Sequence, residues 1–270
     1  MARGEVYIIL TLLIFSILKM ITVILNCYNR PEYLDEQIQA IQNQRVSPSD
    51  IWIWYNMPPS GEHKDLSYTG LKVIYSTHNF QFHGRFTLGL LAQTEYLAFF
   101  DDDTIPGSRW FENCINSEKA VGEGIFGSSG IHLTSHDYSH HKVGWNGLKG
   151  SAVTPVDLVG HAWFFKRNYL NYLWAQPIIS YDNGEDIQLS AWSKILGGIQ
   201  TYVPPHPPNI PELWGSRPEK GLQYGNDSKS SWRRSNHMQL RHSLCSHFTK
   251  FLNWKTAAQE GLQPTNLDVS

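Results

Sequence analysis

The feature that most constrains this chain is a short apolar run that leads directly into three aspartates. Residues 96–100 read Tyr-Leu-Ala-Phe-Phe, and Asp101, Asp102 and Asp103 follow. An apolar run this short favours a buried strand over a helix. Pro106 ends regular structure soon afterwards. The stretch therefore predicts a buried strand with three carboxylates at its end.

Three adjacent carboxylates raise one another's pKa unless positive charge lies among them. Mg²⁺ and Mn²⁺ supply such charge and prefer oxygen ligands. An acidic loop in solvent is the alternative, but such a loop does not need a fully apolar strand before it. We therefore expect a divalent-cation site at residues 101–103.

Strands and helices alternate through the first hundred residues. Strands are predicted over residues 21–25, 51–55, 71–75 and 96–100, and helices after Pro31 and over about residues 86–93. This alternation with short connections favours an α/β fold with a mostly parallel sheet and flanking helices. Ligands bind beyond the carboxyl ends of the strands in such sheets. Polar clusters follow those ends, at residues 26–30, 56, 78–85 and 101–103.

The second half of the chain has a different character. Residues 122–160 are rich in Gly, Ser and His, which predicts loops and antiparallel strands over the open side of the sheet, and residues 161–165 form a further strand. A Pro-rich loop surrounds His206, and a C-terminal helix is expected over residues 231–252. We expect the tail beyond Lys255 to be disordered.

A helix that starts near residue 183 carries two adjacent carboxylates. Asn183 is the expected N-cap, Glu185 and Asp186 lie in the first turn, and the pair Gly197 and Gly198 ends the helix. The helix dipole favours each carboxylate by about 0.3–1 kcal/mol. This stabilisation alone explains their presence, so position by itself does not assign them a chemical role.

Charge and cysteine content exclude some classes of protein. With 22 Lys and Arg against 24 Asp and Glu, the net charge of −2 gives no electrostatic basis for nucleic-acid binding. Cys27, Cys114 and Cys245 are too few and too widely spaced for a disulfide framework or a zinc cluster. A length of 270 residues fits one large domain.

The N-terminus carries an apolar run over residues 6–18, which is shorter than the ~20 residues that span a bilayer. It fits a leader, a signal or a short anchor, or the working protein starts at Met20. We expect residues 1–19 to lie outside the fold, residues 20–252 to form the domain and residues 253–270 to form a tail. Weak membrane association through residues 6–18 gives a cytoplasmic or membrane-associated location.

Three motifs together resemble the GT-A fold of nucleotide-sugar glycosyltransferases. Residues 22–31 resemble the opening strand and loop of family 2 enzymes, residues 99–103 the Asp-x-Asp metal motif, and residues 184–187 the Glu-Asp motif of the acceptor side. Residues 84–86, taken with residues 94–103, are similar to the exostosin-type branch. The layout also resembles sugar transferases encoded by large DNA viruses of algae.

The resemblance implies a donor site that uses Mn²⁺ or Mg²⁺. Asp101 contacts the ribose side, Asp103 holds the metal, and Asp102 supports either role. The metal stabilises charge on the departing diphosphate. His206 is a further candidate metal ligand, with a surface histidine as the alternative. No dinucleotide fingerprint or P-loop is present in the sequence.

The resemblance also assigns the nucleotide contacts. Asn26, Tyr28 and Arg30 are expected to line the nucleotide pocket. Arg85 is expected to contact the diphosphate or the base, because its planar fork suits phosphate. A surface arginine at a helix start is the alternative. Asn56 stands where family 2 enzymes place an acidic residue that recognises the base.

On the acceptor side, family 2 resemblance makes Asp186 the base and Glu185 the residue that orients the acceptor. The exostosin-type resemblance instead implies retention of configuration, with this pair stabilising charge, and the sequence leaves both open. An acceptor surface is expected from three aromatic side chains, because aromatic faces pack against sugar rings. These are His161, Trp163 and Trp214.

The expected function is transfer of a hexose or pentose from a nucleoside-diphosphate sugar, with UDP the expected nucleotide, to a hydroxyl of a glycan or glycoprotein. A nucleotidyltransferase on a similar fold would need a phosphate cradle near the first strand, and residues 26–30 contain no glycine. A non-catalytic protein that binds sugar or nucleotide is the other alternative, and it would not need both carboxylate motifs.

Overall fold

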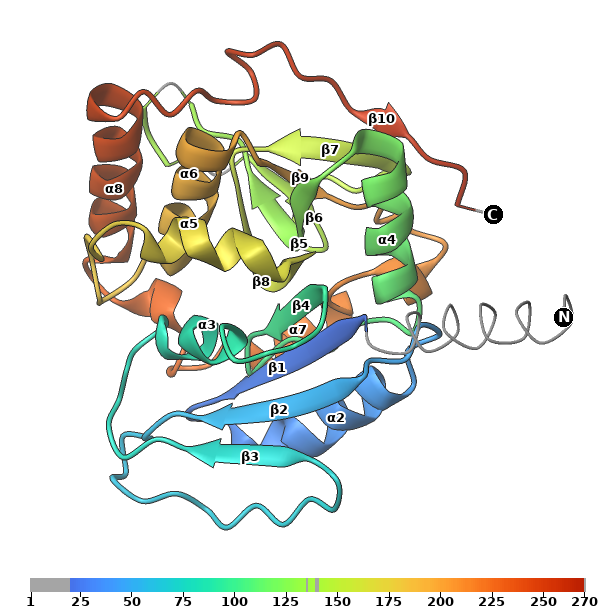
Figure 1. Ribbon diagram of the computed structural model, residues 1–270, viewed down its shortest axis with the longest axis vertical. Helices are drawn as coiled ribbons and strands as arrows, with labels where there is room; N and C mark the ends of the chain where they lie inside the picture. The colour runs from blue at the N-terminus through green and yellow to red at the C-terminus, as the bar shows by residue number, and fades with distance from the viewer. Residues whose placement is uncertain (1–19, 135, 139–140, 270) are drawn as a thin grey trace, which may run out of the picture.

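The computed structural model describes residues 20–134, 136–138 and 141–269, which are built around one large mixed sheet (Figure 1). The strand order is β10-β7-β9-β5-β8-β4-β1-β2-β3, and β6 pairs with β5. The strands are β1 Ile21–Cys27, β2 Asp50–Tyr55, β3 Lys72–Tyr75, β4 Tyr96–Phe100, β5 Gly124–Ile131, β6 Lys142–Gly144, β7 Ala152–Val156, β8 Leu158–Lys166, β9 Gln200–Val203 and β10 Thr265–Asn266.

The N-terminal part of the sheet is parallel, as the sequence predicts. β1 pairs with both β2 and β4 in parallel, and β2 pairs with β3 in parallel. The carboxyl ends of these strands therefore meet at one edge. β8 continues the sheet on the other side of β4 in the antiparallel direction. β4, which carries the aspartates, thus lies where the parallel and antiparallel parts join.

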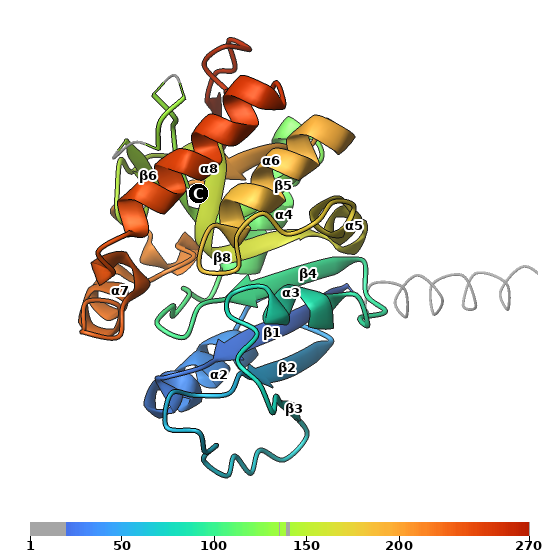
Figure 2. The same cartoon turned by 90° about the vertical axis from the view of Figure 1, so that its left-hand side faces the viewer.

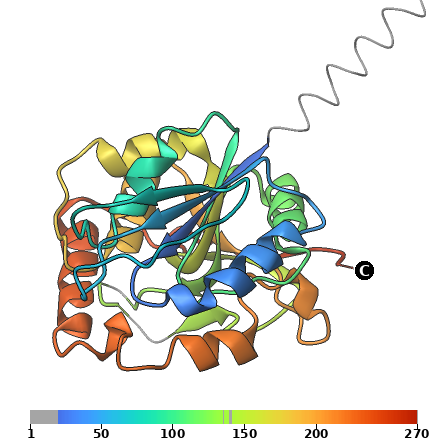
Figure 3. The same cartoon turned by 90° about the horizontal axis from the view of Figure 1, so that it is seen from below.

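The helices cover both faces of the sheet, which confirms the expected α/β class. They are α2 Leu34–Gln42, α3 Gly84–Gly89, α4 Trp110–Val121, α5 Leu170–Trp174, α6 Glu185–Gly197, α7 Pro218–Tyr224 and α8 His237–Phe251. Seen from below, α2 and α3 lie on opposite sides of the N-terminal strands (Figure 3). α8 packs across α6 (Figure 2).

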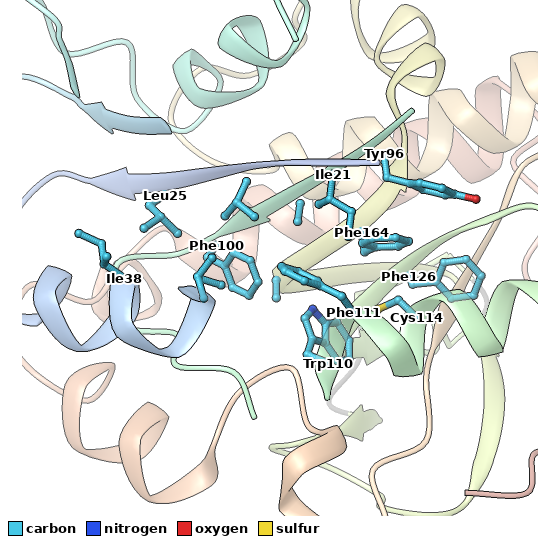
Figure 4. Packing of buried hydrophobic residues seen from close by; sticks show 14 of the residues in the cluster. Ile21, Leu25, Ile38, Tyr96, Phe100, Trp110, Phe111, Cys114, Phe126 and Phe164 are labelled. Carbon is cyan, nitrogen blue, oxygen red and sulfur yellow. The ribbon is translucent and has the colours of Figure 1, made fainter. Parts of the chain in front are cut away.

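Alternation along β4 explains why both faces are covered. Ala98 and Phe100 point into a cluster with α2 and α4, which holds Ile38 and Phe111 (Figure 4). Leu97 and Phe99 point into a second cluster with α3 and α5. Successive strand side chains point to opposite faces, so a fully apolar strand requires cover on both. Full burial of each large apolar side chain contributes about 1.5–3 kcal/mol.

The C-terminal part of the sheet provides the expected antiparallel portion. β8 pairs antiparallel with β5, and β7 pairs antiparallel with β9, while β5 and β9 are parallel. α6 packs over this part, and α8 packs against α6 through Leu244 and Phe248, which contact Ile187 and Ala191 in a third apolar cluster. Residues of β5, β6 and β8 in this part lie around the same space as the residues that follow β1 and β4.

Several predicted boundaries differ from those observed. α3 ends at Gly89 rather than near residue 93, and the predicted helix over residues 231–252 is a 3-10 turn followed by α8. The expected disorder beyond Lys255 is wrong. Ala257 is buried, and its N–H donates to Asp157 Oδ1 at 2.6 Å. Residues 265–266 pair with β7, so the tail is part of the sheet.

The expected membrane association requires a correction. Residues 6–18, on which it depended, lie outside the described residues. Among the helices that the structure does describe, none has the length and apolar character needed to cross a bilayer.

Candidate active site

The three aspartates lie at the tip of β4, in a loop fixed by backbone contacts. The Asp101 N–H donates to the carbonyl of His161 at 2.9 Å, and the Thr104 N–H donates to the carbonyl of Asp101 at 3.1 Å. The buried amide of Gln37, on α2, donates to the carbonyls of Asp101 and Thr104 at 2.7 and 2.8 Å. The loop therefore keeps its shape through hydrogen bonds to its backbone, and these bonds do not use the three carboxylates.

Arg30, which follows β1, compensates part of this negative charge. Its Nη1 lies 2.6 Å from Asp102 Oδ1 and 3.4 Å from Asp103 Oδ2. Its Nε and Nη2 donate to the two carboxylate oxygens of Asp227 at 3.1 and 2.7 Å. Burial and the charges of the adjacent aspartates still raise the pKa of Asp103. Arg30 therefore does not offset the cost of burying the Asp103 carboxylate beside two other carboxylates.

Asp101, Asp103 and His161 could hold a metal ion. One ligand atom from each lies within 4.8 Å of the others. His161 has a φ of 68°, in the left-handed region, where β8 carries an irregularity opposite residues 127–129 of β5. Irregularities of this kind redirect side chains near active sites. Two carboxylates and an imidazole suit Mn²⁺, and the uncompensated charge described above fits a divalent cation.

Arg85, at the start of α3, joins the β4 tip to α6. Its Nη1 contacts Asp101, and its Nη2 lies 3.0 Å from Glu185 Oε1. The guanidinium is 4.7 Å from the ring centroid of Trp163 and is 1% exposed. Arg85, which was predicted to contact the diphosphate or base, thus has both of its terminal nitrogens engaged by carboxylates of the protein. It is a buried bridge between two carboxylates.

Glu185 and Asp186 open α6 as predicted, but Asn183 does not cap the helix. Gly184 is the N-cap, with a φ of 94°, and no side chain caps it. The Asn183 side-chain oxygen instead accepts from Arg241 Nη1 at 2.7 Å. A left-handed residue before the first turn favours glycine. This turn places both carboxylates on the side of the cavity.

Arg241, on α8, holds Asp186 through both of its oxygens. Nη1 lies 3.1 Å from Oδ1 and Nη2 lies 2.5 Å from Oδ2. The Ile187 N–H also donates to Asp186 Oδ1 at 2.8 Å. Burial and the neighbouring Asp186 raise the pKa of Glu185. Each member of the pair therefore has its own arginine, but only Asp186 is held through both oxygens.

A cavity of about 710 Å³ connects these groups. It contains the predicted residues Asn26, Tyr28 and Arg30, the carboxylates of the β4 tip and the pair at the start of α6. The remaining walls come from the antiparallel part and from residues near α7 and α8, and include Tyr138, Lys142, Trp145, His161, Trp163, Leu222, Trp232, Arg234, His237 and Arg241. The structure thus brings the three sequence motifs to one cavity.

Three residues predicted to bind the donor or the metal do not line the cavity, namely Asn56, His206 and the bridging Arg85. Asn56 is buried. Its side-chain nitrogen donates to Asn79 Oδ1 at 2.8 Å, and its side-chain oxygen accepts from the backbone N–H of Phe80 at 3.0 Å. Asn56 therefore shapes a loop instead of facing a base.

His206 is buried, and its Nδ1 lies 2.7 Å from the carbonyl of Pro204. Its Nε2 accepts from the Gly215 N–H at 3.3 Å. Both ring nitrogens of His206 are therefore engaged, and His206 is not part of the group of possible metal ligands at the β4 tip.

The predicted aromatic acceptor surface is only partly present. His161 and Trp163 line the cavity, although Trp163 is almost fully buried in the core. Trp214 is buried in a separate apolar cluster, and its Nε1 donates to the carbonyl of Pro207 at 2.9 Å. Trp214 is therefore not part of the cavity wall.

Arg241 and Asp227 are the main residues that sequence reasoning missed. Asp227 lies in a short polar segment with no periodic pattern. Arg241 did leave a signal, because it shares one helix face with Leu244, Cys245 and Phe248, which are all buried. An arginine on the apolar stripe of a helix requires a buried anionic partner.

Comparisons with known proteins give matches only among solved structures. No family model matches the chain, and no curated protein matches it. Similar structures are TarS of S. aureus, at 11% identity over 69% of this chain, and its fragment 1–349, at 12% identity over 69%, both with a TM-score of 0.48. The fragment in complex with UDP-GlcNAc matches equally well. The aligned regions cover 37%, 60% and 58% of those structures, so the chain spans less than two thirds of their length.

Proposed function

We propose that this protein is a metal-dependent glycosyltransferase of the GT-A type, which moves a sugar from a nucleoside diphosphate to a hydroxyl group. The observation that carries the proposal is the gathering of two carboxylate centres in one cavity. The first centre consists of Asp101 and Asp103, which lie with His161 at the β4 tip. The second consists of Glu185 and Asp186, and the buried Arg85 links the two centres by contacting Asp101 and Glu185. A donor substrate needs the first centre, and an acceptor hydroxyl needs the second.

The donor would lie across the carboxyl ends of β1 and β4. Asn26 and Tyr28 offer polar contacts for a nucleoside, with UDP the expected nucleotide. Asp101, Asp103 and His161 would hold Mn²⁺ or Mg²⁺. When bound, such a metal stabilises the negative charge that develops on the departing diphosphate. Arg30 lies beside this position and keeps Asp102 directed toward it.

The acceptor reaction needs a group that takes a proton. The acceptor oxygen forms a bond to the anomeric carbon, the bond from that carbon to the diphosphate oxygen breaks, and the hydroxyl proton moves to a carboxylate. Asp186 is the base that the family resemblance implies. Glu185 is a second candidate, because its Oε1 binds Arg85 while its Oε2 has no hydrogen-bond partner among the described residues. A retaining reaction would use the same pair to stabilise positive charge on the sugar.

The rival functions gain less support from the site. A nucleotidyltransferase would use a phosphate cradle after β1, where residues 26–30 instead bring Arg30 against aspartates. A non-catalytic binding protein has no need for the arginine partners that hold Glu185 and Asp186 in fixed positions. A glycan or glycoprotein acceptor and a hexose or pentose donor sugar therefore remain the proposed substrates.

Donor hydrolysis with Mn²⁺, screened across common nucleotide sugars, tests the proposal. We expect hydrolysis of at least one donor, and we expect Asp103→Ala to abolish it. Asp50→Ala, which removes an exposed carboxylate outside the cavity, is the control and should retain activity. Asp186→Asn and Glu185→Gln should each lower kcat for transfer far more than they weaken donor binding, and the larger loss identifies the base. Normal turnover by Asp103→Ala would refute the assignment.

A further inference from the structure

The cavity also carries a basic cluster that the proposed donor contacts do not include. The cluster comprises Lys142 of β6, Arg234 before α8, and His237 and Arg241 of α8. Burial, together with the charges of Arg241, Arg234 and Lys142, lowers the pKa of His237 to about 4. The three cations and this imidazole line the same cavity, although Lys142 comes from a different part of the chain.

Among the described residues, Asp186 is the one carboxylate that forms an ion pair with a member of this cluster. Of the cations in the cluster, Asp186 pairs with Arg241 alone. The nearby carboxylate of Asp137 lies 3.8 Å from His242, which is outside the cluster. The Arg234 guanidinium donates to a backbone carbonyl, that of Asp182, at 3.2 Å. Lys142 makes no ion pair with any described residue. Positive charge thus exceeds negative charge in this part of the cavity.

Two nitrogen atoms of the cluster, His237 Nδ1 and Arg241 Nε, are buried without a hydrogen-bond partner among the described residues. Arg241 is 6% exposed, and its Nε has no hydrogen-bond partner among the residues that the structure describes. The same side chain lines the cavity, and its guanidinium carbon lies 4.4 Å from the ring centroid of Tyr138. A buried donor without a partner destabilises the folded protein, and this is the cost that a bound acceptor group can remove. A ligand that accepts from Arg241 Nε would remove that cost.

Two members of the basic cluster, His237 and Arg241, lie on α8, which is separate from the parallel strands that carry the β4 aspartates. Asn26 lies in β1 and the aspartates directly follow β4, both in the parallel part of the sheet. α8 packs on α6, beside the antiparallel part (Figures 1 and 2). The metal and the diphosphate would lie at the β4 tip.

Glu185 and Asp186 lie between the β4 tip and the basic cluster. Glu185 forms an ion pair with Arg85, which also pairs with Asp101 of the β4 tip. Asp186 forms an ion pair with Arg241 of the cluster.

We propose that the acceptor substrate carries an anionic group, a carboxylate or a phosphate, which binds the basic cluster next to the reacting hydroxyl. This inference rests on the proposed function, because it assigns the second substrate of the same site. An anion there would pair with Lys142 and Arg234 and accept from Arg241 Nε. The acceptor would then be an acidic glycan, with either a uronic acid or a phosphorylated sugar as the source of the charge.

Three probes of similar size test the proposal with the full chain. These are methyl glucuronoside, glucose 6-phosphate and neutral methyl glucoside, and each is titrated by NMR without donor and assayed for transfer with Mn²⁺ and the donor from the hydrolysis screen. We expect one anionic probe to bind and react about tenfold better than methyl glucoside, because hydrogen bonds to charged groups are stronger than neutral ones. The preferred anion identifies the source of the charge. Equal behaviour of all three probes would overturn the proposal.

Lys142→Met gives a sharper test, with Lys119→Met on α4 as its control. Lys119 is exposed and does not line the cavity. We expect Lys142→Met to lower the anionic-to-neutral ratio about tenfold and Lys119→Met to leave it unchanged. If Lys142→Met instead weakens UDP binding as much as it weakens probe binding, the cluster serves the donor and the proposal is wrong. Anion binding that depends on Lys142 without any donor hydrolysis would refute the proposed function but keep the anionic site.

Discussion

The buried Arg85 bridge provides the most direct test of how this site is held together. Arg85→Met keeps a side chain of similar length but removes the charge that joins Asp101 and Glu185. Glu185 is 6% exposed, so water cannot replace the lost partner. Removing one partner of a buried ion pair costs about 3–5 kcal/mol, because the other charge stays buried and unpaired. We therefore expect Arg85→Met to lower the free energy of unfolding by that amount.

A double-mutant cycle separates this penalty from a simple loss of packing against Trp163. Glu185→Gln removes the carboxylate that Arg85→Met leaves unpaired, so the double variant should be more stable than the two separate losses predict. Interaction energies between contacting groups reach about 0.5–3 kcal/mol, and the burial of this pair places it near the upper end. We expect a coupling energy of about 2–3 kcal/mol.

Urea unfolding, followed by tryptophan fluorescence with a metal chelator present, measures the cycle. The pH should lie above the raised pKa of Glu185, so that its carboxylate is ionised in the wild-type protein. The half-buried pair Arg109 and Glu112, 3.0 Å apart within one helical turn, is the control. Arg109→Met with Glu112→Gln should give a coupling of only about 0.2–1 kcal/mol. A coupling at Arg85 no larger than that of the control, with unchanged urea dependence, would refute the reasoning.

The remaining predictions concern stability away from the acidic centre. Burial lowers the pKa of His206 to about 4, so its contribution to stability is present above the unfolded pKa of about 6.5 and is lost as the pH falls from there toward about 4. His206→Gln should therefore reduce the slope of unfolding free energy against pH in that window by up to about 1.4 kcal/mol per pH unit, and an unchanged slope in urea titrations would contradict this. Trp254 in the C-terminal tail is 2% exposed and packs against Phe248, so Trp254→Ala should cost about 3–5 kcal/mol in thermal or urea unfolding. Trp232→Ala, at a side chain that is 53% exposed, is the control, with an expected change within about 0.5 kcal/mol, and equal losses in the two variants would show that the tail does not support the fold.

Local patterns in the sequence predicted the part of the fold where neighbours along the chain decide the structure. The four N-terminal strands follow from short apolar runs, and Gly198, with a φ of 66°, ends α6 as expected of a C-terminal glycine. The carboxylates of β4 and α6 also face one cavity, as the positions of their motifs suggested. In each case a short segment contains the physical reason for the result.

Where the structure differs from the sequence-based expectation, the reason is a contact between segments that lie far apart along the chain. Arg85 was expected to face the donor, but a partner 100 positions away, Glu185, keeps it inside. His206 and His161 are equally plausible metal ligands by residue type. Only the irregularity of β8 brings His161 to the aspartates, while the backbone around His206 engages both of its nitrogens. Spacing within a motif contains no information about such partners.

The contact between Arg30 and Asp227 has a consequence for the synthesis of the protein. Arg30 follows the first strand, whereas its partner Asp227 lies 197 positions later. Arg241, the partner of Asp186, comes later in the chain than Asp227. A nascent chain that has folded its N-terminal strands would therefore expose the aspartates of β4 without their complete set of partners. The cavity becomes complete only when α8 has left the ribosome. A chain arrested before α8 is made would contain most of the sheet but no finished substrate site.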